Sequence, residues 1–119
     1  MRGWRDLVYI VVMPLGEFEQ VVLLAILRLG DDAYGTSIRA EIAECTGREP
    51  APGALYTTLD RMEDKGLVTC RMADPTPERG GRAKRYIRVS GAGVDAVTQA
   101  QRSYRRLMEG LDLPGVAYA

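Results

Sequence analysis

The sequence predicts a mainly α-helical fold with one small β-hairpin, an α+β class, that continues into a long C-terminal helix. Apolar residues recur at steps of three and four in four segments, and two short segments alternate apolar and polar residues around a Pro- and Gly-rich turn. The 119 residues, 46% of them hydrophobic and 27% charged, provide material for one domain with one core. The expected helices cover residues 17–29, 34–45, 52–65 and 91–111, and the expected strands cover 67–72 and 84–89.

The first two helices follow from their apolar faces and their end signals. The apolar face of 17–29 consists of Phe18, Val21, Val22, Ala25, Ile26 and Leu29. A Gly-Asp-Asp sequence at 30–32 ends this helix. In the second helix Ile38 and Ile42 lie one turn apart, and Gly47 stands where a helix stops. Two short amphipathic helices therefore precede the third.

The third helix begins at Pro52, because proline suits a first helical turn, and it ends before Gly66. Leu55, Leu59 and Met62 form its buried stripe. The outer face combines short, hydroxyl-bearing and charged side chains, namely Gly53, Tyr56, Thr57, Asp60, Arg61 and Asp64. Such a face packs poorly against protein and suits contact with a polar partner.

The hairpin concentrates positive charge. Residues 79–88 hold five basic and no acidic side chains, which leaves eleven basic and sixteen acidic residues in the rest of a chain whose formal net charge is zero. The five are Arg79, Arg82, Lys84, Arg85 and Arg88. This charge density attracts phosphate, and the acidic remainder would orient its approach. The alternative is a solvated hairpin without a partner.

The last helix, capped by Ser90, carries apolar residues spaced three, four, three and four apart. They are Val97, Ala100, Tyr104, Leu107 and Leu111. This spacing is typical of a helix that packs against another long helix. Since no other element of the chain is long enough, we expect a homodimer with these residues at the dimer interface. The alternative is that the stripe packs on its own domain.

The composition excludes several classes of function. The chain has no histidine, which removes Ser-His-Asp and Cys-His catalysis and most zinc sites. Asp60, Glu63 and Asp64 lie together on an exposed helix face, so we expect solvated charge and not acid–base catalysis. The sequence therefore predicts no enzyme, no catalytic residue, no metal site and no cofactor.

Cysteine usage and hydropathy indicate a cytoplasmic protein. Cys45 and Cys70 are too far apart for a CxxC motif and too few for a disulfide framework, so we expect both in or near the core of a protein in a reducing compartment. A redox-sensing pair is the alternative. The longest apolar run near the start, residues 7–13, is far shorter than the roughly 20 residues that span a bilayer, and no membrane partner is expected.

The chain divides into four parts by the change in its character. Residues 1–14 are an N-terminal extension, either without ordered structure or not native. The break in character at Met13-Pro14 favours the hypothesis that 1–12 are an upstream extension or result from an incorrectly assigned gene start. Residues 15–90 form the helical and hairpin domain. Residues 91–112 form the dimerisation helix, and 113–119 are a tail.

Three short helices followed by a basic hairpin is the order of a winged helix-turn-helix. The chain also resembles the PadR family of bacterial transcriptional regulators over about residues 15 to 95. The segments that carry the resemblance are LLAIL at 23–27, AYG at 33–35, PGALYTTL at 52–59, GLV at 66–68 and GGRAKRY at 80–86. Their combination and order are specific, although each segment alone is weak.

The resemblance implies a homodimeric repressor that binds an inverted-repeat operator in double-stranded DNA. In that family the C-terminal helix, often with the N-terminal one, forms the dimer, and the single C-terminal helix here resembles the short-tailed branch. The resemblance places Pro52, Gly53, Tyr56 and Thr57 at the start of the recognition helix and Gly81, Arg82 and Lys84 in the wing.

The residues themselves add expectations about DNA contacts. Arg61 is the outer-face side chain able to make two hydrogen bonds to a guanine, with Asp60 available to orient it. Tyr56 either contacts DNA or steadies helix packing. Basic wing residues would hold phosphate and supply affinity and register. The complete expected DNA-binding set is Pro52, Gly53, Tyr56, Thr57, Arg61, Arg79, Gly81, Arg82, Lys84 and Arg85.

A winged-helix module that binds protein without specific DNA binding is the alternative function, because a net charge of zero provides no long-range steering toward DNA. Some members of the family bind aromatic ligands at the dimer interface, in some cases through tryptophans of the C-terminal helix. The single tryptophan here, Trp4, lies outside the matched segments, so a small-molecule effector has no support in this sequence.

Overall fold

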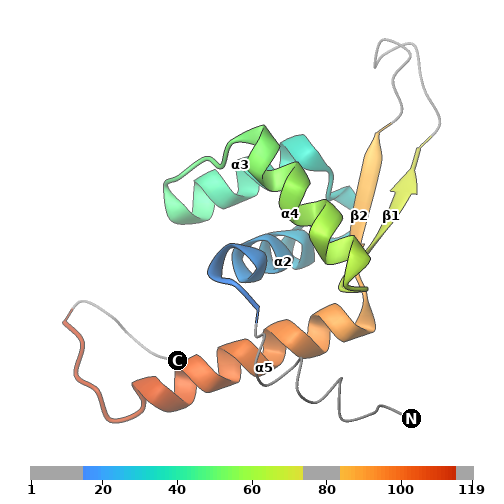
Figure 1. Cartoon of the computed structure of the whole chain (residues 1–119). Coiled ribbons are helices and arrows are strands. Elements are labelled where there is room, and N and C mark those ends of the chain that lie inside the picture. Colours follow the sequence, from blue (N-terminus) through green and yellow to red (C-terminus); the bar gives the residue numbers. More distant parts are fainter. Residues whose placement is uncertain (1–14, 74–83, 115–119) are drawn as a thin grey trace, which may run out of the picture.

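The computed structural model describes residues 15–73 and 84–114. The elements are α2 (Glu17–Leu29), the 3-10 turn η1 (Gly30–Asp32), α3 (Gly35–Thr46), α4 (Pro52–Asp64), β1 (Val68–Met72), β2 (Arg85–Val89) and α5 (Gly91–Met108). Within this part of the chain, four α-helices and a two-stranded hairpin make the α+β fold and the winged-helix order that the sequence predicts (Figure 1). The expectations for residues 1–14 and 115–119 lie outside the described residues.

Helix α2 lies at the centre of the fold because its apolar face is wide. It packs against α3, α4, α5 and β2. Val22, Leu23 and Ile26 are almost completely buried there, and Leu23 joins the predicted face although the sequence analysis did not include it. The partly buried border of this face consists of Phe18, Val21 and Leu29.

Helices α3 and α4 have ends close to those predicted. The Tyr34 amide donates a hydrogen bond to Ser37 Oγ at 2.9 Å where α3 begins, and Gly47 ends the helix with a φ of 75°. Pro52 occupies the first turn of α4. The buried stripe of α4 contains the three predicted residues and one more, and consists of Leu55, Thr58, Leu59 and Met62.

The hairpin pairs β1 with β2 in antiparallel register, with Val68 opposite Val89 and Cys70 opposite Ile87. A single bridge between Tyr34 and Tyr86 adds the segment before α3 to this sheet, and the Ile87 amide donates to the Ala33 carbonyl at 2.8 Å. The alternation in β1 does not continue to its end, because Met72 is 60% exposed at the outer end of the strand. The sheet therefore joins the hairpin to the helix pair α3 and α4.

Helix α5 follows the hairpin directly and lies across the opposite end of the domain from the first turn of α4 (Figure 1). Ser90 Oγ accepts the Gly93 amide at 3.1 Å, which confirms the predicted cap. The helix ends at Met108, so the expectation that it reaches Leu111 is wrong: the Glu109 backbone departs from helical geometry and Gly110 adopts a φ of 80°. Among the described helices none combines the length and the apolar character needed to cross a bilayer.

Candidate nucleic-acid interface

The outer face of α4 is exposed along its whole length, as predicted. Pro52, Gly53 and Thr57 lie in its N-terminal half, where a Cβ at Gly53 would meet nothing within 4 Å. Ala51 provides no side-chain cap, and no side chain within 15–73 and 84–114 binds the first amides of this helix, so they can donate to a partner. A polyanion can approach the backbone closely here.

Tyr56 contacts the start of α3 and remains 45% exposed. A Cβ added at Gly35 would overlap the Tyr56 hydroxyl and would lie 3.0 Å from Cζ of the same ring. One part of the ring thus steadies the contact between α3 and α4, while the rest faces solvent. The packing role has structural support, and contact with DNA stays a prediction.

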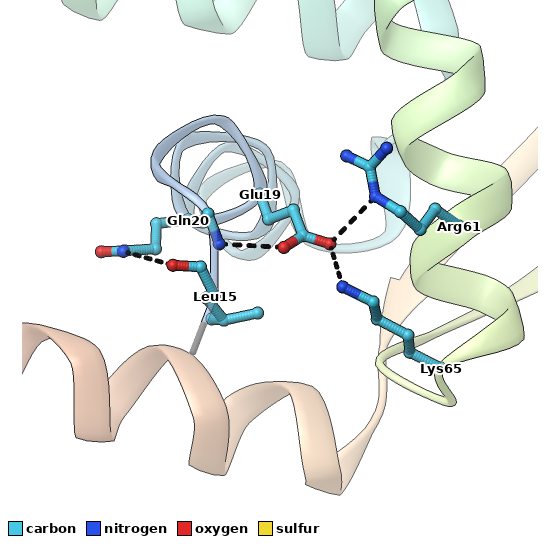
Figure 2. A network of polar contacts seen from close by, with 6 residues as sticks. Leu15, Glu19, Gln20, Arg61 and Lys65 are labelled. Atoms are coloured by element: carbon cyan, nitrogen blue, oxygen red, sulfur yellow. Dashed lines mark hydrogen bonds and ion pairs between the residues drawn. The ribbon is translucent and has the colours of Figure 1, made fainter. Parts of the chain in front are cut away.

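Arg61 lies in the last turn of α4 and is held by a residue that the sequence analysis did not select. Its Nε lies 3.5 Å from Oε2 of Glu19, and Lys65 Nζ lies 2.9 Å from the same oxygen (Figure 2). The expectation that Asp60 orients Arg61 is wrong, because Asp60 pairs with Arg85 on β2. The Arg61 side chain is half exposed, and its bond to guanine stays a prediction.

Glu19 is buried, at 4% exposure, in the first turn of α2. Burial by itself raises the pKa of its carboxyl. The amide hydrogen bond from Gly16 at 2.9 Å, followed by Lys65 and Arg61, outweighs burial and holds the pKa below its ordinary value. The carboxylate is therefore ionised at neutral pH and forms a charge-assisted link between α2 and the end of α4.

The inner part of the wing is built from aromatic rings with cations over them. Lys84 Nζ lies 4.1 Å from the centre of the Tyr34 ring, and Arg71 Cζ lies 4.8 Å from that of Tyr86. The two rings meet edge to face, with centroids 5.6 Å apart. Two cations thus have fixed places beside the sheet, of which Arg71 was not among the expected site residues.

The basic run is partly neutralised by acidic residues that are distant in sequence. Arg85 lies 3.0 Å from Asp60 and 3.3 Å from Glu63, both on α4, and its side chain is only 25% exposed. Arg88 pairs with Asp31 at 2.9 Å. Phosphate contact by Arg85 stays a prediction and would compete with these pairs. The expected wing residues Arg79, Gly81 and Arg82 lie outside the described residues.

The apolar stripe of α5 divides into a buried and an exposed part. Val97 is 3% exposed and belongs to the core of its own domain, as the alternative for this stripe predicted. Ala100 is half-buried, whereas Tyr104 and Leu107 are 49% and 76% exposed. Leu111 is exposed beyond the end of the helix. The outer part of the stripe is free for a partner.

Helix α2 adds apolar surface that the sequence analysis missed. Leu24 and Leu27 are exposed, and their spacing from Gln20 puts all three on one face of the helix. The side-chain Oε1 of Gln20 accepts a hydrogen bond from Nε2 of Gln101 on α5 at 3.2 Å, so this face is turned toward α5. The helical periodicity of residues 17–29 was the sequence signal for this exposed surface, because both leucines lie off the buried side of the helix.

The expectation that both thiols lie in or near the core is confirmed for Cys70, which packs against the core, and is wrong for Cys45. Cys45 is exposed and contacts Glu41 at 3.4 Å, a hydrogen bond that raises the pKa of the thiol. Cys70 is half-buried in the sheet, and burial raises its pKa. Neither environment favours a reactive thiolate. Within residues 15–73 and 84–114 no group of three or more metal-ligating side chains is suitably placed to hold an ion.

Known proteins share both the sequence and the fold. Transcriptional regulator Rv3488 of Mycobacterium tuberculosis is 33% identical over 79 residues, which are 65% of this chain and 67% of that protein. The structure of hsRosR-S1 in a complex is 25% identical with a TM-score of 0.66, and the match covers 82% of this chain and 79% of that one. F93 from STIV, a winged-helix DNA-binding protein, is 14% identical with a TM-score of 0.60 over 78% of this chain and 92% of its own, which shows a shared fold.

The family model for PadR-like transcriptional regulators matches residues 23–99. That range extends from the middle of α2, through the outer face of α4 and the hairpin, into the first half of α5. It includes the described residues that build the exposed α4 face and the base of the wing. This chain therefore belongs to the PadR-like transcriptional regulator family.

Proposed function

We propose that this transcriptional regulator is a homodimeric repressor that binds an inverted-repeat operator, with α4 in the major groove and the wing on the phosphate backbone. The observation that carries the proposal is the exposed N-terminal half of α4, where an open glycine, a hydroxyl-bearing pair and uncapped amides lie together. An α-helix fits the major groove, and its N-terminal residues reach base edges first.

The charge arrangement supports different roles for the two ends of α4. Asp60 and Asp64 make the outer face of its C-terminal half acidic, which disfavours close approach of phosphate there. Tyr56 and Thr57 lie about one turn before Asp60 and two turns before Asp64. Their hydroxyls can donate hydrogen bonds to phosphate or base edges. Lys84, whose ammonium group lies over the Tyr34 ring, supplies a cation for the adjacent phosphate backbone of the DNA.

A dimer through α5 would join the two DNA-binding units at the end opposite the first turn of α4 (Figure 1). Tyr104 and Leu107 supply an exposed apolar surface for this contact, and Leu24 and Leu27 extend it onto α2. A two-fold dimer would place its recognition helices in successive major grooves, so half-sites should be centred about 10 base pairs apart or at a multiple of that distance.

A protein-binding module is the second candidate, and one observation favours it. Arg61, Arg85 and Arg88 are all paired with carboxylates, which lowers the positive potential expected on the DNA-facing side. Release of Arg85 from α4 would be needed before it could hold phosphate. A hollow beside the sheet, lined in part by Thr69, Tyr86 and Arg88, is partly open to solvent and gives a small-molecule effector no support.

The test is selection of operator sequences from random duplex DNA at two salt concentrations. We expect an inverted repeat whose binding weakens steeply with salt, because phosphate contacts release counterions. The combined variant Arg82→Glu and Lys84→Glu should weaken binding by at least about tenfold at low salt. The matched control is Arg102→Glu with Arg105→Glu, which changes the net charge equally on exposed positions of α5.

Two outcomes would count against the proposal that α4 and the wing bind operator DNA. One is the absence of any enriched sequence, and the other is equal loss of binding in the wing variant and in the control. The second result would mean that overall charge, and not the wing, governs attraction to the duplex. Repression itself is tested separately by placing the selected operator in a reporter promoter, where the protein should lower transcription.

A further inference from the structure

Two adjacent polar residues in the first turn of α2 are buried, and their side chains bind different elements. Glu19 is 4% exposed and Gln20 is 7% exposed. Burial of polar groups costs free energy unless hydrogen bonds replace the lost water. Each of the two has such partners, and the partners lie on different elements, α4 for Glu19 and α5 for Gln20.

Glu19 holds the C-terminal end of the recognition helix. Its Oε2 binds Lys65 at 2.9 Å and Arg61 at 3.5 Å, while Oε1 accepts the Gly16 amide at 2.9 Å (Figure 2). Both carboxylate oxygens are therefore engaged, which restricts the rotation of the side chain. Hydrogen bonds of this kind are directional, so they restrict the angle of α4 against α2 more than apolar packing does.

Gln20 holds α5 in a corresponding way. Its Oε1 accepts a hydrogen bond from Nε2 of Gln101 at 3.2 Å, and its own Nε2 donates to the Leu15 carbonyl at 3.3 Å. The contact with Gln101 lies one turn after Val97, which anchors α5 in the core. Beyond it come Tyr104 and Leu107, the residues of the proposed dimer surface.

We propose that Glu19 and Gln20 are positioning residues that set the spacing between operator half-sites without touching DNA. The inference rests on the proposed dimer through α5. In such a dimer the separation of the two recognition helices depends in part on the path from α5 through α2 to α4, beside the direct contact of α5 with Leu67. The adjacent pair Glu19 and Gln20 binds both neighbours of α2 on that path. One base pair advances a duplex by about 3.4 Å, so a small change at either contact alters the preferred spacing.

The experiment measures binding to duplexes that contain two selected half-sites separated by spacers from two base pairs shorter to two longer than the optimum. The wild-type protein should prefer one spacer sharply. In Glu19→Gln the ratio of affinities for the optimal spacer and for one shifted by one base pair should fall about fivefold. Gln101→Ala should act in the same direction, and the preferred half-site sequence should stay unchanged in both.

Matched controls separate positioning from general weakening. Glu17→Gln makes the same chemical change at an exposed position of the same turn, and Gln99→Ala does so on α5. Both should retain the wild-type spacer profile. A folded Glu19→Gln variant that keeps the sharp preference, or that loses affinity equally for every spacer, would overturn the inference.

A measurement without DNA keeps this inference distinguishable from the proposed function. Spin labels introduced at Thr57→Cys on α4 and Arg102→Cys on α5, with Cys45→Ser and Cys70→Ala, report the distance between the two helices. Glu19→Gln should broaden the distance distribution, and Glu17→Gln should not. Equal widths of the distance distribution in both variants would contradict the positioning role of Glu19 even if an operator is found. Failure to find an inverted repeat would contradict the proposed function alone.

Discussion

At the scale of single residues, the buried carboxylate of Glu19 joins α2 to the end of α4. Burial of a charged side chain normally costs free energy. The Glu19 side chain is 5% exposed, yet its pKa is lowered because the Gly16 amide and Lys65 compensate for burial. A group whose pKa is lower in the folded state stabilises that state above its unfolded pKa, which for glutamate is about 4.3. The stabilisation is lost as the pH falls through the folded pKa.

We therefore expect Glu19→Gln to lower the free energy of unfolding by about 2 kcal/mol at pH 7. The difference from wild type should be smaller at pH 3 than at pH 7, because a falling pH favours protonation of the wild-type carboxyl. Urea denaturation at the two pH values checks this. Glu17→Gln, which removes an exposed carboxylate from the same turn, should change stability by less than about 0.5 kcal/mol at either pH. A constant difference across pH would show that ionisation of Glu19 is irrelevant to stability.

At the scale of elements, α5 is attached to the hairpin through a very close backbone contact. Gly93 lies against the carbonyl of Leu67, so that an added Cβ would overlap this oxygen and lie 2.7 Å from Cγ1 of Val89. The Leu67 carbonyl also accepts the Ser90 amide at 3.0 Å, which limits how far it can move. The first turn of α5 therefore needs glycine for space and not for a special φ.

Gly93→Ala should destabilise the protein by about 2 kcal/mol, because the backbone cannot give way as a flexible side chain would. Gly91→Ala is the matched control in the same turn, since a Cβ there would meet nothing within 4 Å. It should leave stability unchanged or raise it by up to about 1 kcal/mol. Thermal or chemical unfolding of the two variants checks the contrast, and similar midpoints for both would refute the close contact.

At the scale of the whole molecule, the fold separates two surfaces. The first turn of α4 faces one end of the domain, and α5 with its exposed Tyr104 and Leu107 lies across the other (Figure 1). A second copy can therefore bind at α5 without covering α4, the proposed recognition helix. The same separation makes the path through α2 important, because this path and the contact of α5 with the Leu67 carbonyl connect the two surfaces.

Leu107→Asp should convert the proposed dimer into monomers. Leu107 is 76% exposed in the single chain, so the change should leave the fold of the protomer intact, whereas a charge buried in a dimer seam is costly. We expect the dimer dissociation constant to rise by about 100-fold, measured by sedimentation equilibrium. Thr98→Asp adds the same charge on another face of α5 and should leave the dimer intact. A dimer that survives Leu107→Asp would place the interface elsewhere.

Local patterns in the sequence were sufficient to predict the elements and much of the exposed α4 face. Helical periodicity and the capping or stop residues Ser90, Gly47 and Pro52 act within a few residues of each other, so they are visible along the chain. The alternation of the two strands and the turn between them predicted the hairpin in the same way. The length of α5 was overestimated because the apolar spacing continues past the last helical turn.

The charged network depended on the tertiary structure. Glu19 is separated from Arg61 by 42 residues and from Lys65 by 46, and no periodic pattern connects positions so far apart. For the same reason the sequence favoured a pair of Asp60 with Arg61, its neighbour in the chain, whereas the fold brings Asp60 of α4 to Arg85 of β2. It also could not divide the α5 stripe into a buried Val97 and an exposed Leu107, because the packing of α2 against α5 decides where the domain core ends. Ion pairs and burial depend on distance in space, which the chain acquires only when its helices pack.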